Sequence, residues 1–178
     1  MAAWIDILRP IGQVAAVSEV SLESLEYCGL TGIILDLDNT ITPWGSIQIP
    51  AEILEWLLEA KQFGFRLCLV SNNRGPRLPA VAQKIGIPFI PSANKPGLRA
   101  FRQALQIMGI PREQVAVIGD QVFTDVLGGN RMGLHTILVT PLTPREFIGT
   151  RCIRVVERAF MQFLEYRCIP LARNGETI

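Results

Sequence analysis

The feature that most constrains the fold is a strict alternation of short apolar runs with helical segments. Five runs are typical of fully buried strands: residues 32–37, 66–71, 87–90, 115–120 and 135–139. Helical patterns follow or separate them at residues 50–64, 80–85, 96–109 and 125–131. Parallel strands need crossover helices, so this order predicts right-handed βαβ units. We therefore expect an α/β fold with a parallel sheet covered by helices on both faces.

The two ends of the chain fall outside this alternation. Residues 1–31 are expected to form an N-terminal extension with a short helix, which Ser21 caps and Gly29 ends. Residues 32–143 are expected to form the core, and residues 144–178 a helical tail that carries several arginines.

Net charge, the apolar runs and the cysteine pattern limit the partners and the location expected for this protein. The net charge is +1 over 178 residues, so no strongly basic surface is indicated and nucleic acid is not an expected partner. The best apolar run is interrupted by Asp36 and Asp38, which argues against a membrane span. The N-terminus lacks a secretory pattern, and the four cysteines are scattered without a C-x-x-C pair. These features predict a cytoplasmic protein, and they leave its oligomeric state open.

Polar residues gather at the predicted carboxyl ends of the strands, which is where open α/β sheets bind ligands. The first strand ends in Asp36-Leu37-Asp38-Asn39-Thr40. The second ends in Ser71-Asn72-Asn73, and Lys95 follows the third strand just before Pro96. The fourth ends in Gly119-Asp120 and is followed by Thr124-Asp125. Charged and hydroxylic groups are therefore expected to converge on one edge of the sheet.

The spacing of the first two aspartates favours phosphoryl chemistry. Residues two apart in an extended segment point to the same side, about 6–7 Å apart. Asp36 can then act as a nucleophile that accepts a phosphoryl group, and Asp38 as general acid and base. Two carboxylates at one site repel, so a divalent cation is expected. Asp36 and Asp120, with a backbone carbonyl and waters, offer the oxygen ligands that Mg²⁺ prefers.

The remaining polar residues have supporting roles in this interpretation. Lys95 offers a positive charge to the phosphoryl oxygens, and Ser71 a hydroxyl donor. Asn72 is a further candidate for phosphate binding. Asp125 either orients the metal waters or the lysine, or simply caps a helix. Thr40 and Asn73 are candidates to support the site from behind the reacting groups.

The motifs DLDNT, SNN, KP and GDQVFTD, in that order, resemble the four motifs of the haloacid dehalogenase (HAD) superfamily of phosphohydrolases. Within it the chain is similar to the YqeG family, classed among the subfamily IIIA phosphatases and similar in turn to phosphatidylglycerophosphatases of mitochondria and plastids. The resemblance implies a Rossmann-like fold and an aspartyl-phosphate intermediate. It also implies Asp36 as nucleophile, Asp38 as acid and base, and Mg²⁺ held by Asp36, Asp120 and the carbonyl of Asp38.

The connections between strands are too short for a cap domain, which needs about 50 residues or more. An uncapped site admits a phosphate displayed on something large, such as a lipid. Apolar and arginine residues near both ends, around Trp4 and in residues 145–163, would suit an anionic membrane surface or would pack on the sheet. Trp44 would line the mouth of the site or pack beneath it.

Three functions are therefore weighed. The first is Mg²⁺-dependent hydrolysis of a membrane-borne phosphomonoester such as phosphatidylglycerophosphate, with peripheral membrane contact. The second is a soluble phosphatase acting on a sugar phosphate, a nucleotide or a phosphoprotein. The third is a non-catalytic binding protein that keeps the fold.

Overall fold

The computed structural model describes residues 6–144. Its strands are β1 (Gly12–Val14), β2 (Gly32–Leu35), β3 (Arg66–Val70), β4 (Phe89–Ile90), β5 (Val115–Gly119) and β6 (His135–Val139). Its helices are α2 (Leu22–Tyr27), α3 (Ala51–Gln62), α4 (Arg77–Ile85), α5 (Leu98–Met108) and α6 (Leu127–Met132). Short 3₁₀ turns lie at η1 (Val17–Glu19) and η2 (Arg112–Gln114), and a π turn, η3, spans Val122–Val126.

The strands form one parallel sheet in the order β1-β6-β5-β2-β3-β4. From β2 the chain builds β3 and β4 on one side, then returns to build β5 and β6 on the other. The strand order therefore reverses beside β2, and such a switch point leaves a crevice at the carboxyl ends of the strands. The predicted parallel α/β fold is confirmed.

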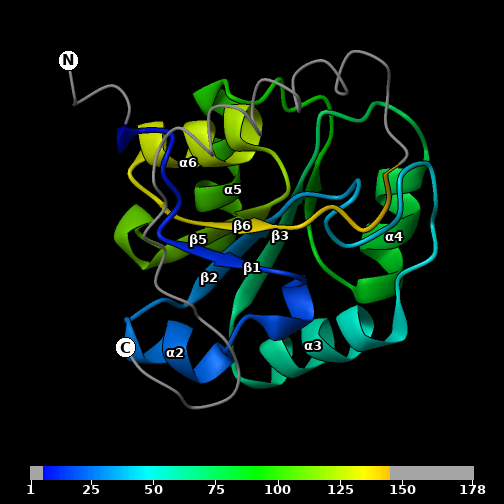
Figure 1. Ribbon diagram of the computed structural model, residues 1–178, viewed down its shortest axis with the longest axis horizontal. Coiled ribbons are helices and arrows are strands. Elements are labelled where there is room, and N and C mark those ends of the chain that lie inside the picture. Colours follow the sequence, from blue (N-terminus) through cyan, green and yellow to red (C-terminus); the bar gives the residue numbers. More distant parts are fainter. Residues whose placement is uncertain (1–5, 145–178) are drawn as a thin grey trace.

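Helices cover both faces of this sheet (Figure 1), with α2 and α3 on one side and α5 and α6 on the other. Side chains of β2 alternate between the two apolar cores, since Ile33 and Leu35 join the α3 side and Ile34 joins the α5 side. Strands β3 and β5 alternate in the same way. Burial on both faces explains why these strands read as continuous apolar runs.

Local signals in the sequence set the ends of several helices. The side chain of Ser21 caps α2 by accepting a hydrogen bond from the Ser24 amide at 3.0 Å. Helices α4 and α5 end at Gly86 and Gly109, whose φ values of 73° and 63° lie in the left-handed region that glycine tolerates best.

Several features differ from the sequence-based expectation. Strands β2 and β4 are shorter than the expected runs 32–37 and 87–90. Strand β1 was not expected, and it lies within the segment assigned to an N-terminal extension. Helix α4 begins at Arg77 rather than Ala80, and α5 at Leu98 rather than Pro96. The segment expected as one helix from Asp125 is divided between the π turn η3 and α6.

Of the apolar residues around Trp4, the structure describes Ile7 and Leu8, and both pack against the body of the protein. Leu8 is buried in a small cluster with Val122, Val126 and Leu138, and Ile7 packs against the same cluster. Trp4, Ile5 and the expected helical tail lie outside the described residues. None of the helices within residues 6–144 is both long and apolar enough to span a bilayer.

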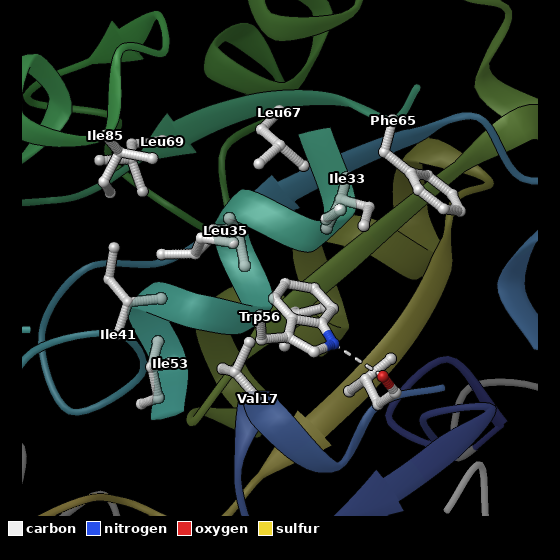
Figure 2. Close-up of a cluster of buried hydrophobic side chains, with 14 of the residues drawn as sticks. Val17, Ile33, Leu35, Ile41, Ile53, Trp56, Phe65, Leu67, Leu69 and Ile85 are labelled. Carbon is white, nitrogen blue, oxygen red and sulfur yellow. Dashed lines mark hydrogen bonds between the residues drawn. The ribbon is translucent and has the colours of Figure 1, made fainter. Parts of the chain in front are cut away.

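Trp56 anchors the larger core. Its side chain is fully buried on α3 among Val17, Ile33 and Ile53, as Figure 2 shows. The indole Nε1 donates a hydrogen bond of 2.7 Å to the carbonyl oxygen of Val20. This bond ties α3 to the segment that precedes α2, so the N-terminal region is fastened to the core by both packing and a satisfied polar contact.

Trp56→Phe is expected to lower the free energy of unfolding by about 1 to 3 kcal/mol, because it opens a cavity and leaves the buried Val20 carbonyl without its donor. Urea denaturation measures this loss. The control is Tyr27→Phe, since Tyr27 is 81% exposed and its hydroxyl loss should change stability by less than about 0.5 kcal/mol. Equal effects from both variants would contradict the anchoring role.

Candidate active site

The first motif lies at the carboxyl end of the central strand. The Asp36 amide donates to the carbonyl of Ile118 at 3.0 Å, so the backbone continues the β2–β5 ladder up to the aspartate. Asp36 and Asp38 are both buried, at 7% and 8% exposure. Thr40 is buried behind them and donates through Oγ1 to Asp120 Oδ1 at 3.4 Å. The first motif thus meets the fourth across neighbouring strands.

Lys95 joins two of the aspartates. Its Nζ lies 2.6 Å from Asp36 Oδ1 and 2.6 Å from Asp125 Oδ1, and its side chain is only 3% exposed. The backbone of Lys95 is held by Asn72, whose Oδ1 accepts from the Lys95 amide at 2.7 Å and whose Nδ2 donates to the Lys95 carbonyl at 3.3 Å. The Asn72 amide group therefore positions the lysine.

Asp125 reaches this lysine because of Gly119. A Cβ at Gly119 would lie 2.3 Å from Asp125 Cγ, so only glycine lets the carboxylate pack against the end of β5. The π turn η3 presents Asp125, and Asp125 Oδ2 accepts from the Gln121 amide at 3.3 Å. Such π turns occur often at functional sites. The glycine of the fourth motif is therefore needed for close approach of the aspartate that follows it.

Asp38 points to a different set of partners. Its Oδ1 accepts from Arg77 Nη1 at 2.6 Å, and its Oδ2 from Asn73 Nδ2 at 3.1 Å. The Gly45 amide lies 3.5 Å from Oδ1. The two aspartates of the first motif thus have separate cations, with Lys95 beside Asp36 and Arg77 beside Asp38.

Three carboxylates could hold a metal ion. Oxygens of Asp36, Asp120 and Asp125 all lie within 4.8 Å of one another, and all three residues are buried. Three carboxylates and one ammonium leave a formal charge of −2, which a divalent cation would balance. Oxygen-only ligands suit Mg²⁺. The expected side-chain ligands Asp36 and Asp120 are in this group, and Asp125 joins them. The Asp38 side chain is not in the group.

Burial and neighbouring charges shift the pKa values of Asp36 and Lys95. Desolvation raises the pKa of Asp36 from 3.8 to about 7; Lys95 opposes this change, while Asp125 and Asp38 add to it. Desolvation also disfavours the charged form of Lys95, but the carboxylates of Asp125 and Asp36 outweigh it and raise the pKa of the ammonium above its usual value. The lysine is therefore a permanent cation, while Asp36 resists ionisation, and a further cation bound beside it would lower that cost.

A pocket opens over these residues. It is lined by Asp36, Asp38, Trp44, Ser71, Asn72, Asn73, Lys95, Gln121 and Thr124. Ser71 is buried and its Oγ accepts from the Asn73 amide at 3.1 Å, so its hydroxyl hydrogen can turn towards a bound anion. Trp44 lies at the mouth and is 38% exposed, which resolves the two placements left open for it.

The structure brings together every residue expected at the site, gives Thr124 a place in the pocket lining, and adds Gln121 and Arg77. Gln121 and Thr124 line the pocket, and Arg77 contacts Asp38. Gln121 and Thr124 lie inside the fourth motif, so their place beside Asp120 was a usable signal. Arg77 had no such signal, because an arginine at the start of a helix is ordinarily a surface residue.

Comparison with known proteins shows which families this chain resembles. Residues 92–141 match the model of the HAD-hydrolase-like family. The chain is 42% identical over 146 residues to the Bacillus subtilis protein named Probable phosphatase YqeG, covering 82% of this chain and 85% of that protein. It is 30% identical to the chloroplastic phosphatidylglycerophosphate phosphatase 1 of Chlamydomonas reinhardtii, over 71% of this chain and 51% of the algal protein. The chain therefore spans about half the length of that algal relative.

A solved structure from Vibrio cholerae, assigned as a 3-deoxy-D-manno-octulosonate 8-phosphate phosphatase, shares the fold with a TM-score of 0.51. It is 16% identical and covers 93% of this chain and 98% of its own. The Bacillus subtilis relative, together with the family model that matches residues 92–141, shows the class, which is that of the HAD phosphatases. Within that class the chain belongs to the YqeG family.

Asp36→Asn is expected to stabilise the metal-free protein at neutral pH. Asp36 has a raised pKa in the folded state, so its ionisation costs stability as pH rises from about 4 to about 7. The neutral amide avoids that cost. At pH 8 in a chelator the variant should gain about 1 to 3 kcal/mol, or several degrees in Tm, and the gain should vanish below pH 4.

Thermal unfolding across this pH range measures the effect. The matched control is Glu55→Gln, the same change of charge at an exposed site on α3, which should show little pH-dependent difference. An Asp36→Asn variant that is less stable than the wild type at pH 8 would contradict the burial argument.

Proposed function

We propose that this HAD phosphatase hydrolyses phosphomonoesters with Mg²⁺, through an aspartyl-phosphate formed on Asp36. The observation that carries the proposal is the buried contact of Lys95 Nζ with Asp36 and Asp125, each at 2.6 Å, beside the Asp120 carboxylate. A buried cation next to a carboxylate nucleophile can neutralise the phosphoryl oxygens as attack begins, and it needs little rearrangement to do so.

The chemistry divides into two displacements. In the first, a carboxylate oxygen of Asp36 attacks phosphorus, the bond from phosphorus to the leaving oxygen breaks, and that oxygen takes a proton from Asp38. In the second, the Asp38 carboxylate takes a proton from water, the water oxygen attacks phosphorus, and the bond to Asp36 breaks. Inorganic phosphate leaves, and both aspartates return to their starting states.

The other residues bind and orient in this scheme. Ser71 donates its hydroxyl to a phosphoryl oxygen, Asn72 holds Lys95 in place, and Thr40 and Asn73 orient Asp120 and Asp38. Asp36, Asp120 and the backbone carbonyl of Asp38 would hold Mg²⁺, with Asp125 close by. When bound, Mg²⁺ neutralises charge on the carboxylates and on the phosphoryl group.

For the substrate we propose a phosphomonoester at a membrane surface, with phosphatidylglycerophosphate as the leading candidate. The algal relative carries that activity in its name. Within residues 6–144, the connections from β2 to β3 and from β3 to β4 hold one helix each, so neither supplies a cap over the pocket. Trp44 and Ile47, at 38% and 51% exposure, lie in the loop after the first motif and would suit contact with a lipid interface.

Asp36→Asn is expected to reduce turnover by about a thousandfold or more, because the amide cannot accept the phosphoryl group. Phosphate release is measured with phosphatidylglycerophosphate in detergent micelles and with a panel of sugar phosphates and nucleotides. Glu55→Gln serves as the control and should keep wild-type turnover. Good turnover of a soluble ester with no release from the lipid would favour the soluble phosphatase; full activity of Asp36→Asn would overturn the mechanism.

Asp120→Asn is expected to weaken Mg²⁺ binding, since it replaces a carboxylate ligand with a neutral one. Activity should fall at low Mg²⁺ and recover in part at high Mg²⁺, so that the metal titration shifts by about tenfold or more. The same titration on wild type and Glu55→Gln gives the reference curves. Full activity of Asp120→Asn at trace metal would remove Asp120 from the metal site.

A further inference from the structure

Arg77 is a second cation at the site, and the reaction described above gives it no task. It is the first residue of α4, and its Nη1 donates to Asp38 Oδ1 at 2.6 Å and to the carbonyl of Ser46 at 3.4 Å. Its guanidinium carbon lies 6.0 Å from the centroid of the Trp44 ring, within reach of a cation–π contact. Both Asp38 and Trp44 line the pocket, so Arg77 lies at the edge of the pocket.

Lys95 is more deeply buried than Arg77. The Lys95 side chain is 3% exposed and contacts the nucleophile, whereas that of Arg77 is 21% exposed and contacts the proton donor. Both hydrogen bonds of Arg77 within the described part of the chain come from Nη1. The planar guanidinium therefore keeps donors on Nε and Nη2, the arrangement that binds a phosphate or carboxylate through two parallel bonds.

Reaction geometry says which part of a substrate would meet this arginine. Asp38 gives its proton to the leaving oxygen, so the group attached to that oxygen must lie among the neighbours of Asp38. Asp38 contacts Arg77, Asn73 and the Gly45 amide, and Trp44 lies beside Arg77 and lines the same pocket. An anionic group on the leaving alcohol would thus be placed beside a partly exposed cation.

We propose that Arg77, with Trp44 packed beside it, forms a subsite for a second anionic group carried by the leaving alcohol. The preferred substrates are phosphomonoesters whose alcohol also carries a phosphodiester or a similar anion. This inference rests on the proposed function and narrows it. When Arg77 turns to such a group, Asp38 keeps its contacts with Asn73 and the Gly45 amide, so the proton donor stays in place.

The test uses two substrates in which the reacting phosphate is attached to the same glycerol unit. Glycerol 3-phosphate carries no second anion, whereas glycerophosphoglycerophosphate, the deacylated form of the lipid, carries a phosphodiester. Wild type should prefer the second by about tenfold or more in kcat/KM, the scale of one charge-assisted pair. Arg77→Gln should reduce this preference to about twofold or less, mainly through KM, and Arg77→Lys should keep part of it.

Controls separate this role from a general effect of charge or folding. Arg74→Gln removes an exposed arginine three residues before Arg77 and should keep the preference. Thermal unfolding of each variant checks that the fold persists, and Arg77→Lys gives a second reading if Arg77→Gln does not fold. A preference that is unchanged in Arg77→Gln, or lost equally in Arg74→Gln, would overturn the subsite.

Two further comparisons complete the test. One asks whether the second anion is recognised within the pocket or only at a lipid surface, and the other separates failure of the subsite from failure of the proposed function. In Arg77→Gln, kcat/KM relative to glycerol 3-phosphate should fall both for the lipid in micelles and for its deacylated form. An effect confined to micelles would assign Arg77 to contact with the lipid surface and overturn the subsite. Asp36→Asn is run in parallel. If it abolishes turnover while Arg77→Gln changes nothing, the subsite fails and the proposed function stands; if Asp36→Asn remains active, the proposed function itself fails.

Discussion

The site depends on one buried ammonium group held between two carboxylates. Lys95 is almost fully enclosed, and its Nζ contacts Asp36 and Asp125 at equal distances of 2.6 Å. A buried ammonium with no carboxylate partner at all would cost several kcal/mol, and here two carboxylates share that role. The lysine follows β4, the first aspartate ends β2 and the second lies on the turn after β5. The sheet must therefore assemble correctly before this charge arrangement exists.

Packing of the apolar layers holds the sheet together, and this in turn fixes the positions of the polar residues at its edge. Each central strand sends alternate side chains into two cores, one under α3 and α4 and the other under α5. Within residues 6–144, the buried charged side chains all lie beyond the carboxyl ends of the strands: Asp36, Asp38, Lys95, Asp120 and Asp125. The strand ends thus present Asp36 and Asp120 from fixed positions, while the loop after β3 brings Asn73 to Asp38 and the turn after β5 brings Asp125 to Lys95. Positioning of this kind is what phosphoryl transfer asks of a protein.

Much of this arrangement could be predicted from the sequence, because buried parallel strands leave continuous apolar runs and their carboxyl ends meet at one edge. That reasoning placed Asp36, Asp38, Ser71, Lys95 and Asp120 together. It could not find β1, since Gly12–Val14 is three residues long and carries no apolar run. It also expected a plain helix at Asp125, because a π turn has no distinct side-chain pattern. Arg77 was not indicated, since its contact with Asp38 arises from how α4 packs and not from spacing along the chain.

The position of β2 in the middle of the sheet has a consequence for partly folded forms of the protein. Asp36 has β3 and β4 on one side and β5 and β6 on the other, and it needs Lys95 from the first pair and Asp125 from the second. Detachment of either half would separate Asp36 from Lys95 or from Asp125. A nascent or damaged chain would therefore lack the arrangement on which the proposed ester cleavage depends until both halves have closed around the central strand.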